Sequence, residues 1–313
     1  MGLPAEQGVR IGLSAVVIAL RDRQACVLTT PGDDGALALP FGPFDPARDR
    51  TFELALRAFV TAQTGFRLGF VEQLYTFGDL GRASPRATPG PERRREVSVG
   101  YLALTADAAD APLAEARWTP VLDIFPWEDR RDGAAACLGP LLDGLGAWAA
   151  GDPRRQARVD ALFAPGPAHR WNEGRVLERY ELLYEAGLVA EAARDRDRPA
   201  PPGAPGRAMA SDHRRILATG LGRLRSKLKY RPVLFDLMPS TFTLSELQAA
   251  AEAVAGLSLH KQNFRRGVER TGLVEPTGRL SAATGGRPAE LFRTVGGDRS
   301  AADALGLPLP AQR

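Results

Sequence analysis

The sequence is poor in the residues from which metal and redox sites are built. Its 313 residues include only three histidines and two cysteines, and the histidines are widely spaced. This scarcity excludes a histidine–cysteine zinc cluster, a histidine-centred catalytic cluster and a disulfide framework. We therefore expect Cys26 and Cys137, which lie in apolar surroundings, to be core thiols.

Long hydrophobic runs are also missing. No apolar stretch is long enough to cross a bilayer, and the first residues lack the basic-then-apolar order of a signal peptide. We therefore predict a cytoplasmic protein without a membrane partner. Hydrophobic residues make up 44% of the chain and charged residues 25%, which is typical of a globular protein, and the length predicts two domains.

Acidic residues are scarce in one part of the chain. Residues 258–293 hold seven lysines and arginines against three glutamates, so this stretch alone matches the net charge of +4 of the whole chain. A clustered positive charge favours a polyanionic partner such as nucleic acid. The alternative is a solvated surface in an arginine-rich sequence.

The amino-terminal half alternates strand and helix patterns. Two apolar, β-branched segments at 11–20 and 25–30, separated by a charged turn, predict a hairpin. Apolar residues at helical spacing predict a helix over 51–64 that ends at Gly65. Other predicted elements are strands at 66–77 and 96–104, a loop at 81–95, and helices at 133–150 and 172–193.

A proline-rich stretch divides the chain. Residues 195–207 hold four prolines and several charges, which predicts an interdomain linker. A helix with apolar residues on one face then begins near Asp212. The expected division is a first domain at 8–194, a linker at 195–210, a second domain at 211–296 and a flexible tail at 297–313.

The first domain contains a degenerate motif. Leu39-Pro-Phe-Gly-Pro-Phe, then Glu53-Leu-Ala-Leu-Arg57, then the closing Gly65-Phe66 resemble the Nudix box, in which a glycine-rich loop precedes a helix that carries acidic residues. The resemblance covers about half the chain, and it implies an α/β (α+β) Nudix-like sandwich.

The acidic residues of that motif are absent. Active Nudix enzymes use helix glutamates to hold magnesium beside a pyrophosphate. Here Ala62 and Gln63 occupy the adjacent acid positions, Phe59 occupies the earlier one, and Glu53 is the only acid in the helix. We predict no Nudix hydrolysis, no metal site and no bound cofactor. The alternative is an active Nudix pyrophosphohydrolase that acts on a nucleoside diphosphate derivative.

The Nudix resemblance also implies a pocket for a nucleoside diphosphate compound such as ADP-ribose. Basic side chains beside the box are the expected phosphate contacts, because guanidinium groups match phosphate geometry. The alternative is that they are ordinary surface arginines. The candidate effector-binding residues are Arg48, Arg50, Arg57 and Arg67.

The second domain has the pattern of a winged helix-turn-helix. Thr243-Leu-Ser-Glu246 is a capping box that starts a helix, and Gly256 permits a sharp turn. A second, basic helix begins near Leu259 with Phe264 and Val268 on its expected buried side. Two short strands follow, with a Gly-Gly-Arg-Pro turn before the second.

The outer face of the basic helix suits double-stranded DNA. Arginine and lysine match guanine edges or phosphates, and asparagine and glutamine match adenine edges. The alternative is a winged helix that binds protein. The candidate DNA-binding residues are Thr243, Lys261, Gln262, Asn263, Arg265, Arg266 and the wing residue Arg287.

Taken together, several segments resemble the Nudix-related transcriptional regulators of NAD metabolism. They include Arg95-Glu-Val-Ser-Val-Gly-Tyr, Phe242-Thr-Leu-Ser-Glu-Leu-Gln and Asn263-Phe-Arg-Arg followed by Gly-Leu-Val-Glu-Pro-Thr-Gly. The resemblance implies a homodimeric repressor that binds operator DNA and responds to ADP-ribose or a related nucleotide. A two-domain interaction scaffold that binds neither ligand is the remaining alternative.

Overall fold

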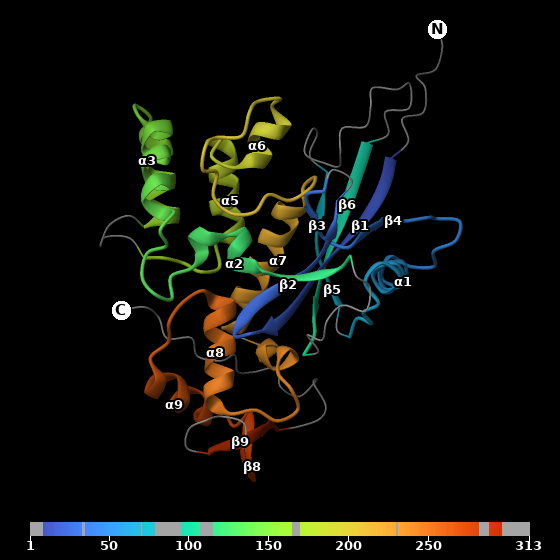
Figure 1. Cartoon of the computed structure of the whole chain (residues 1–313), viewed down its shortest axis with the longest axis vertical. Coiled ribbons are helices and arrows are strands. Elements are labelled where there is room, and N and C mark those ends of the chain that lie inside the picture. Colours follow the sequence, from blue (N-terminus) through green and yellow to red (C-terminus); the bar gives the residue numbers. More distant parts are fainter. Residues whose placement is uncertain are drawn as a thin grey trace.

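The computed structural model describes residues 9–32, 35–69, 71–78, 95–106, 115–164, 170–229, 231–281 and 288–295. Three sequence expectations fall outside these ranges, namely the wing residue Arg287, the tail at 297–313 and the loop positions 81–94. Figure 1 shows a mixed sheet with helices on both faces and, below it, a smaller body that ends in a two-stranded wing.

The amino-terminal domain is built on one seven-stranded sheet with the main strand order β3-β2-β1-β6-β5. Strand β1 pairs in parallel with β6 and in antiparallel with β2 and β4. The predicted hairpin is confirmed, and its turn is made by Asp22 and Arg23, whose φ angles of 49° and 61° suit a two-residue hairpin turn. The strands are β1 (Val9–Arg21), β2 (Gln24–Pro31), β3 (Leu37–Ala38), β4 (Phe41–Pro43), β5 (Val71–Phe77), β6 (Arg95–Leu104) and β7 (Arg117–Pro120).

Strand β1 contributes to a hydrophobic core on each face of the sheet. Leu13, Ala15 and Val17 pack in one cluster with helix α1 (Phe52–Thr64), whereas Val16 and Ile18 belong to a larger cluster on the other face. Successive side chains of a strand point to opposite faces, so one strand serves both cores. Helix α1 ends at Gly65 as predicted, and the α/β sandwich predicted from the sequence is confirmed.

Helices that the sequence located less accurately lie on the side of the second sheet face, where they contribute to the larger hydrophobic cluster. The chain divides the predicted helix at 172–193 into two, with Gly187 between them at a φ of 75°. Helix α4 was not predicted, although Asp152 caps its first turn and Pro153 occupies its first position. The elements of this region are α2 (Val121–Ile124), η1 (Pro126–Glu128), α3 (Leu138–Ala149), α4 (Pro153–Phe163), α5 (Val176–Glu185) and α6 (Ala190–Asp195).

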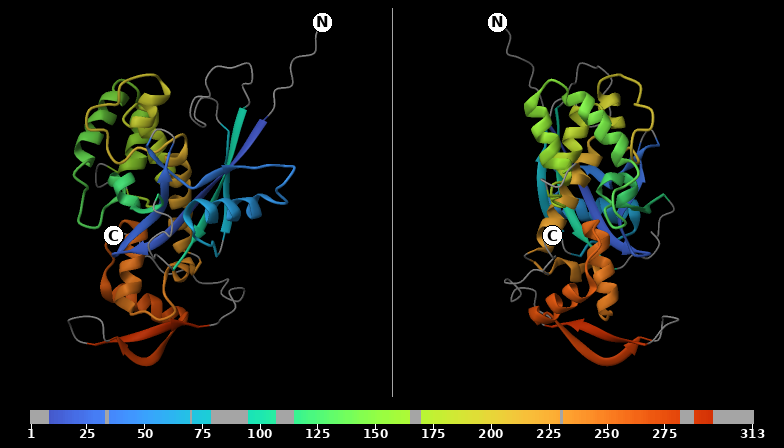
Figure 2. Two further views of the ribbon diagram at one scale, coloured as in Figure 1. Left: turned by 45° about the vertical axis from the view of Figure 1, so that its right-hand side comes forward. Right: turned by 90° about the vertical axis from the view of Figure 1, so that its left-hand side faces the viewer.

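Helix α7 (His213–Leu228) lies between these helices and the sheet. Its Leu217 and Leu221 belong to the same hydrophobic cluster as Val16 of β1, and a Cβ added at Gly220 would lie 3.0 Å from the Val16 side chain. Figure 2 shows α7 on the sheet face away from α1. A helix expected in the second domain therefore packs against the sheet of the first.

Residues 195–210, expected to be a linker, lie against the amino-terminal domain. Met209 is fully buried and forms a bridge with Leu37, and the backbone N–H of Arg207 donates to the carbonyl of Asp123 at 2.9 Å. These contacts hold the segment in place, so it is not a free spacer.

The carboxy-terminal domain has the predicted helix, turn, helix and wing. Gly256 ends its first long helix at a φ of 68°. Phe242 forms an isolated antiparallel bridge with Phe292 of the wing, a contact that the sequence did not predict. The elements are η2 (Val233–Leu237), α8 (Leu244–Ala255), α9 (Lys261–Thr271), β8 (Val274–Ser281) and β9 (Ala289–Thr294). Among the described helices of the chain, none combines the length and apolarity needed to cross a membrane.

Candidate nucleic-acid interface

Helix α9 separates buried apolar residues from an exposed polar face. Phe264 and Val268 are fully buried and belong to the large hydrophobic cluster that also includes Leu247 and Val254 of α8. The exposed residues of α9 include four of the predicted DNA-binding positions, Lys261, Gln262, Asn263 and Arg266. The fold therefore presents these polar side chains together on a rigid helix.

Three of the candidate side chains on α9 are already hydrogen-bonded within the domain. The Arg266 guanidinium donates to Oδ1 of Asn263 at 2.9 Å, so the acceptor of that amide is occupied. Arg265 is half-buried, and its Nη2 donates to the Ser245 hydroxyl on α8 at 3.2 Å. Arg265 therefore also helps to hold α9 against α8.

Thr243 has a structural role in this domain. It is 7% exposed, its hydroxyl accepts from the backbone N–H of Glu246 at 3.1 Å, and its own N–H donates to the Glu246 carboxylate at 2.7 Å. This confirms the predicted capping box. Because the hydroxyl is engaged and buried, the structure does not present it to DNA as the sequence analysis expected.

The wing adds two further arginines. Arg279 is exposed on β8, whereas Arg293 on β9 pairs across the wing with Glu275 on β8, with Nε and Oε1 2.7 Å apart. Arg279 is therefore the described wing residue whose position best suits a phosphate contact. Arg287, the residue expected in that role, lies outside the described residues.

Two of the three residues predicted to occupy acid positions of the Nudix box, Phe59 and Gln63, pack on the glycine-rich loop. Gln63 binds both backbone groups of Phe41, with its Oε1 accepting at 3.3 Å and its Nε2 donating at 2.6 Å. Phe59 lies so close to Gly42 that a Cβ added there would be 3.1 Å from its ring. Among the described residues, no group of three or more His, Cys, Asp or Glu is placed to hold a metal ion.

The four candidate effector-binding arginines lie around α1 but not in one described pocket. Arg48 and Arg50 are exposed before the helix, and Arg67 is exposed after it. Arg57 donates to the carbonyl oxygens of Leu68 and Gly69 and pairs with Glu53, so it orders the end of the box.

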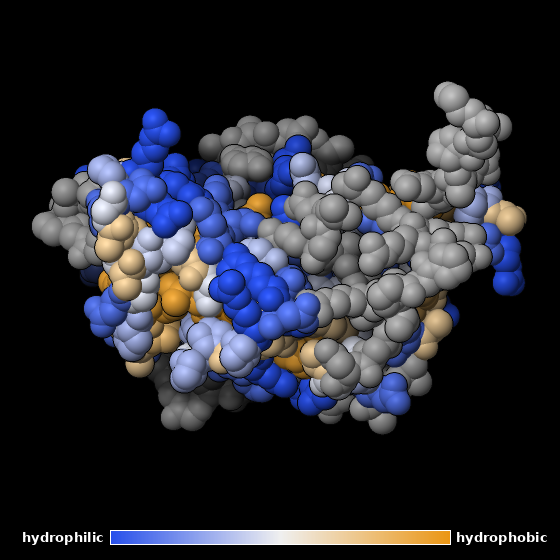
Figure 3. Space-filling view, turned by 90° about the horizontal axis from the view of Figure 1, so that it is seen from above, coloured by the Kyte–Doolittle hydropathy of each residue, from blue (hydrophilic) through white to orange (hydrophobic). Residues whose placement is uncertain are grey.

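A cavity of about 420 Å³ lies elsewhere, lined by Gln24, Leu122, Asp123, Pro126, Asp129, Arg131 and residues 132–136. None of the four arginines lines it. On the face seen in Figure 3, opposite the wing, hydrophobic side chains show only in small areas between hydrophilic ones. The described part of that face presents no broad apolar surface.

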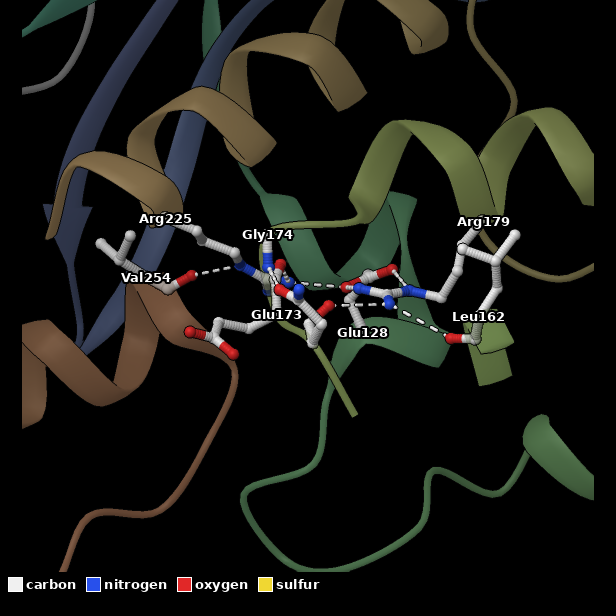
Figure 4. A network of polar contacts seen from close by, with 8 residues as sticks. Glu128, Leu162, Glu173, Gly174, Arg179, Arg225 and Val254 are labelled. Atoms are coloured by element: carbon white, nitrogen blue, oxygen red, sulfur yellow. Dashed lines mark hydrogen bonds and ion pairs between the residues drawn. The ribbon is translucent and has the colours of Figure 1, made fainter. Parts of the chain in front are cut away.

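A buried ionic network joins the two domains, and no sequence pattern predicts it. Figure 4 shows the carboxylate of Glu128 between the guanidinium groups of Arg179 and Arg225, at 2.6–2.8 Å. All three side chains are fully buried. Burial alone raises the pKa of Glu128, but the charges of the two arginines and their hydrogen bonds outweigh it and lower that pKa below its ordinary value. No motif marked Glu128, since these residues are far apart in the sequence.

Fold and site together define a class: a Nudix-like α/β domain joined to a winged-helix domain with a polar, basic second helix. The comparisons with known proteins agree with this class. Residues 234–294 match a family model described as the NrtR DNA-binding winged helix domain. The carboxy-terminal domain is thus similar to the NrtR DNA-binding winged helix domain.

A curated relative and two solved structures extend the comparison. The chain is 41% identical over 85 residues to the ADPR responsive transcriptional repressor NtrR of Acinetobacter baylyi, a match that spans 27% of this chain and only 34% of the relative. It is 20% identical to Shewanella oneidensis NrtR complexed with a 27mer DNA, with a TM-score of 0.55 and coverage of 95% and 97% of the two chains. A MutT/nudix family protein of Enterococcus faecalis is 15% identical, with a TM-score of 0.51 and coverage of 92% and 89%. At these identities the solved structures establish a shared fold, and they confirm the two-domain architecture predicted from the sequence.

Proposed function

We propose that this chain is a sequence-specific DNA-binding transcriptional repressor of NAD-metabolism genes. Its amino-terminal domain senses ADP-ribose or a related nucleotide and does not hydrolyse it. The protein acts as a homodimer in the cytoplasm, on operator DNA of the nucleoid.

The observation that carries the DNA-binding function is the outer face of α9. Lys261, Gln262, Asn263 and Arg266 are exposed together, while Phe264 and Val268 anchor the helix. This places hydrogen-bonding and positively charged groups on the second helix of a helix-turn-helix, the element that enters a major groove in this fold. The match of residues 234–294 to a DNA-binding winged-helix model supports the same role.

The sensing function is supported by the similarity to the curated relative, an ADPR responsive transcriptional repressor. It is also supported by the non-acidic side chains, such as Gln63, at the predicted acid positions of the Nudix box. A Nudix-like domain without its carboxylates is suited to bind a nucleotide without cleaving its pyrophosphate. Arg48, Arg50 and Arg67 are the exposed basic groups proposed to meet the phosphates, and Arg57 is proposed to hold the adjoining loop.

The nucleotide regulates DNA binding because it binds two geometries of the dimer with different affinities. In a dimer, two recognition helices reach successive major grooves only at one spacing, about one helical turn of DNA apart. A nucleotide that prefers a different dimer geometry moves the helices off that spacing, and by linkage operator DNA weakens the binding of that nucleotide by the same factor.

Fluorescence anisotropy on the DNA upstream of the protein's own gene, at fixed salt, tests the proposal. Tight binding that ADP-ribose weakens is the expected result, and sedimentation of the complex should give two chains for each duplex. Binding no tighter than to random duplex of the same length contradicts the DNA-binding function. Binding that ADP-ribose leaves unchanged contradicts the proposed effector.

A further inference from the structure

The turn between α8 and α9 is held directly by the amino-terminal domain. The backbone N–H of Arg130 donates to the carbonyl of Gly256 at 2.8 Å, and Arg130 and Leu257 form a parallel bridge. One residue further along, the Ser258 hydroxyl donates to the carbonyl of Arg131. The segment that leads into α9 is thus paired with residues 130–131, which follow η1.

The side chain of Arg225 supports the same turn from α7. Its Nε donates to the carbonyl of Val254, in the last turn of α8, at 2.8 Å, and its Nη1 donates to Glu128 at 2.6 Å. Arg225 is fully buried, and the opposite side of Glu128 is held by Arg179 in α5. A single guanidinium therefore connects the end of α8 to the core of the first domain.

Gly256 lies in the closest part of this contact. A Cβ added there would lie 2.4 Å from the carbonyl oxygen of Glu128 and 2.8 Å from Nη2 of Arg225. Glu128 and Arg225 belong to the packed core, so neither group can move aside without disturbing the ion pair. The contact admits no side chain at this position.

Asp129 orders the first-domain side of the contact. Its Oδ1 accepts from the backbone N–H of Arg131 at 3.2 Å, and its carboxylate binds the Arg131 guanidinium at 2.7–2.9 Å. These hydrogen bonds of Asp129 close a tight turn. The N–H of Arg130 and the carbonyl of Arg131 in this turn then face Gly256 and Ser258. We call the whole set the turn clamp: Glu128, Asp129, Arg130 and Arg131 with Arg225, against Val254, Gly256, Leu257 and Ser258.

We infer that the turn clamp positions the recognition helix, so that sequence-specific DNA reading by α9 depends on residues 128–131 and Arg225 of the amino-terminal side, none of which lies on α9. The inference rests on the proposed DNA-binding function. It makes Arg225 and Gly256 positioning residues: they act by fixing the start of α9. A displacement of this helix start by a fraction of an ångström misplaces Lys261 and Gln262, the first residues of α9.

The sharpest test compares Gly256→Ala with Gly272→Ala in the full chain. Both glycines end a helix in the left-handed region, at φ angles of 68° and 64°, so alanine strains the backbone equally at both. At Gly272 an added Cβ meets nothing within 4 Å. The difference between the two variants therefore isolates the clamp from the backbone strain.

The DNA probes are a duplex enriched from a random pool by the wild-type protein and a random duplex of equal length. Gly256→Ala should bind the enriched duplex at least about tenfold more weakly than Gly272→Ala does, the loss expected when one base contact is misplaced. Binding to random duplex should change by no more than about twofold, because it depends on charges that neither substitution alters.

Asp129→Ala provides a second variant on a partly exposed side chain, in case Gly256→Ala does not fold. It loosens the turn at 129–131 without touching α8 or α9, and it should lower the affinity for the enriched duplex several-fold while leaving random duplex binding unchanged.

If both variants bind the enriched duplex as tightly as Gly272→Ala, the turn clamp has no positioning role. An equal loss on both duplexes in Asp129→Ala, or in a Gly256→Ala variant that folds, also overturns the inference, because the effect would then not be specific to base reading. If the wild-type protein enriches no duplex, the proposed function fails and this inference fails with it.

Discussion

Nδ1 of His213, at the start of α7, accepts a hydrogen bond from the backbone N–H of Leu39 at 3.1 Å. The imidazole is 5% exposed and lies edge-on to Phe41, so the contact ties the helix layer to the loop of the degenerate Nudix box. An accepting Nδ1 has no proton, and the bond therefore requires the neutral ring. Burial, and secondarily the charge of Arg194, lower the pKa of His213 to about 4.

This pKa predicts that the protein loses stability on mild acidification. The histidine has an ordinary pKa of 6.5 when unfolded, so between pH 6.5 and about 4 the unfolded chain binds more protons than the folded one. As the pH decreases through this window, the free energy of unfolding should therefore decrease by up to about 1.4 kcal/mol per pH unit. Protonation of His213 should cost about 3 kcal/mol in all, in addition to the contributions of other titrating groups.

Urea unfolding at pH 7, 6, 5 and 4.5 measures this dependence. His213→Gln is the matched control, because a glutamine amide oxygen can still accept from Leu39 but does not titrate. The variant should have a shallower pH dependence than the wild type. Identical slopes for the two proteins would show that protonation of His213 does not control acid stability.

The lack of carboxylates at the predicted acid positions of the Nudix box predicts a protein without pyrophosphatase activity. Glu53 is the only acid of α1, and it pairs with Arg57 at 2.8 Å. Release of AMP from ADP-ribose in the presence of magnesium should be the same for the wild type and for Glu53→Gln. A magnesium-dependent release that Glu53→Gln abolishes would instead establish the hydrolase alternative.

Substitution of the recognition helix should weaken specific DNA binding. Lys261→Ala combined with Arg265→Ala removes two charges from α9, and it should cost roughly 1–3 kcal/mol on an operator duplex for each base that these side chains no longer recognise. The salt dependence of binding should also become shallower by about one unit of slope for each phosphate that is no longer neutralised.

Arg48→Ala combined with Arg50→Ala is the matched control, since it removes the same charge from the amino-terminal domain. This variant should keep the operator affinity in the absence of nucleotide and should respond less to ADP-ribose. Equal operator affinity for the two double variants would favour the scaffold interpretation of the chain.

The local elements could be predicted from the sequence because their signals are local. The hydrophobic spacing and the caps Thr243 and Gly256 define α8, and the charged turn at Asp22 and Arg23 defines the hairpin. The assignment of Phe59, Ala62 and Gln63 to the acid positions of the Nudix box rests on a fixed spacing from Gly65, and it stays a prediction.

Contacts between distant segments could not be predicted in this way. The pattern of α7 is amphipathic, and it does not specify whether the apolar face covers the first domain or the second. The sequence predicts a DNA contact for Thr243, because the sequence alone does not show that this residue is buried. No local signal marks Glu128 and Arg225 as buried, since their burial depends on the packing of η1, α5 and α7 around them.

Two ion pairs of similar geometry test what burial contributes to the stability of this chain. Arg179 binds Glu128 through two hydrogen bonds of 2.6 and 2.8 Å, and Arg158 binds Glu185 through two of 3.1 and 2.5 Å. The first pair is fully buried, whereas the side chains of the second are 47% and 46% exposed.

Glu128→Gln should lower the free energy of unfolding by about 3–5 kcal/mol, because it leaves Arg179 and Arg225 buried without a counter-charge. Glu185→Gln should cost less than about 1 kcal/mol, since water solvates the arginine that remains. Chemical unfolding of the two variants at pH 7 measures both values. A cost for Glu128→Gln as small as that for Glu185→Gln would mean that the junction admits water or an anion, which would take over the role of the carboxylate between the two arginines.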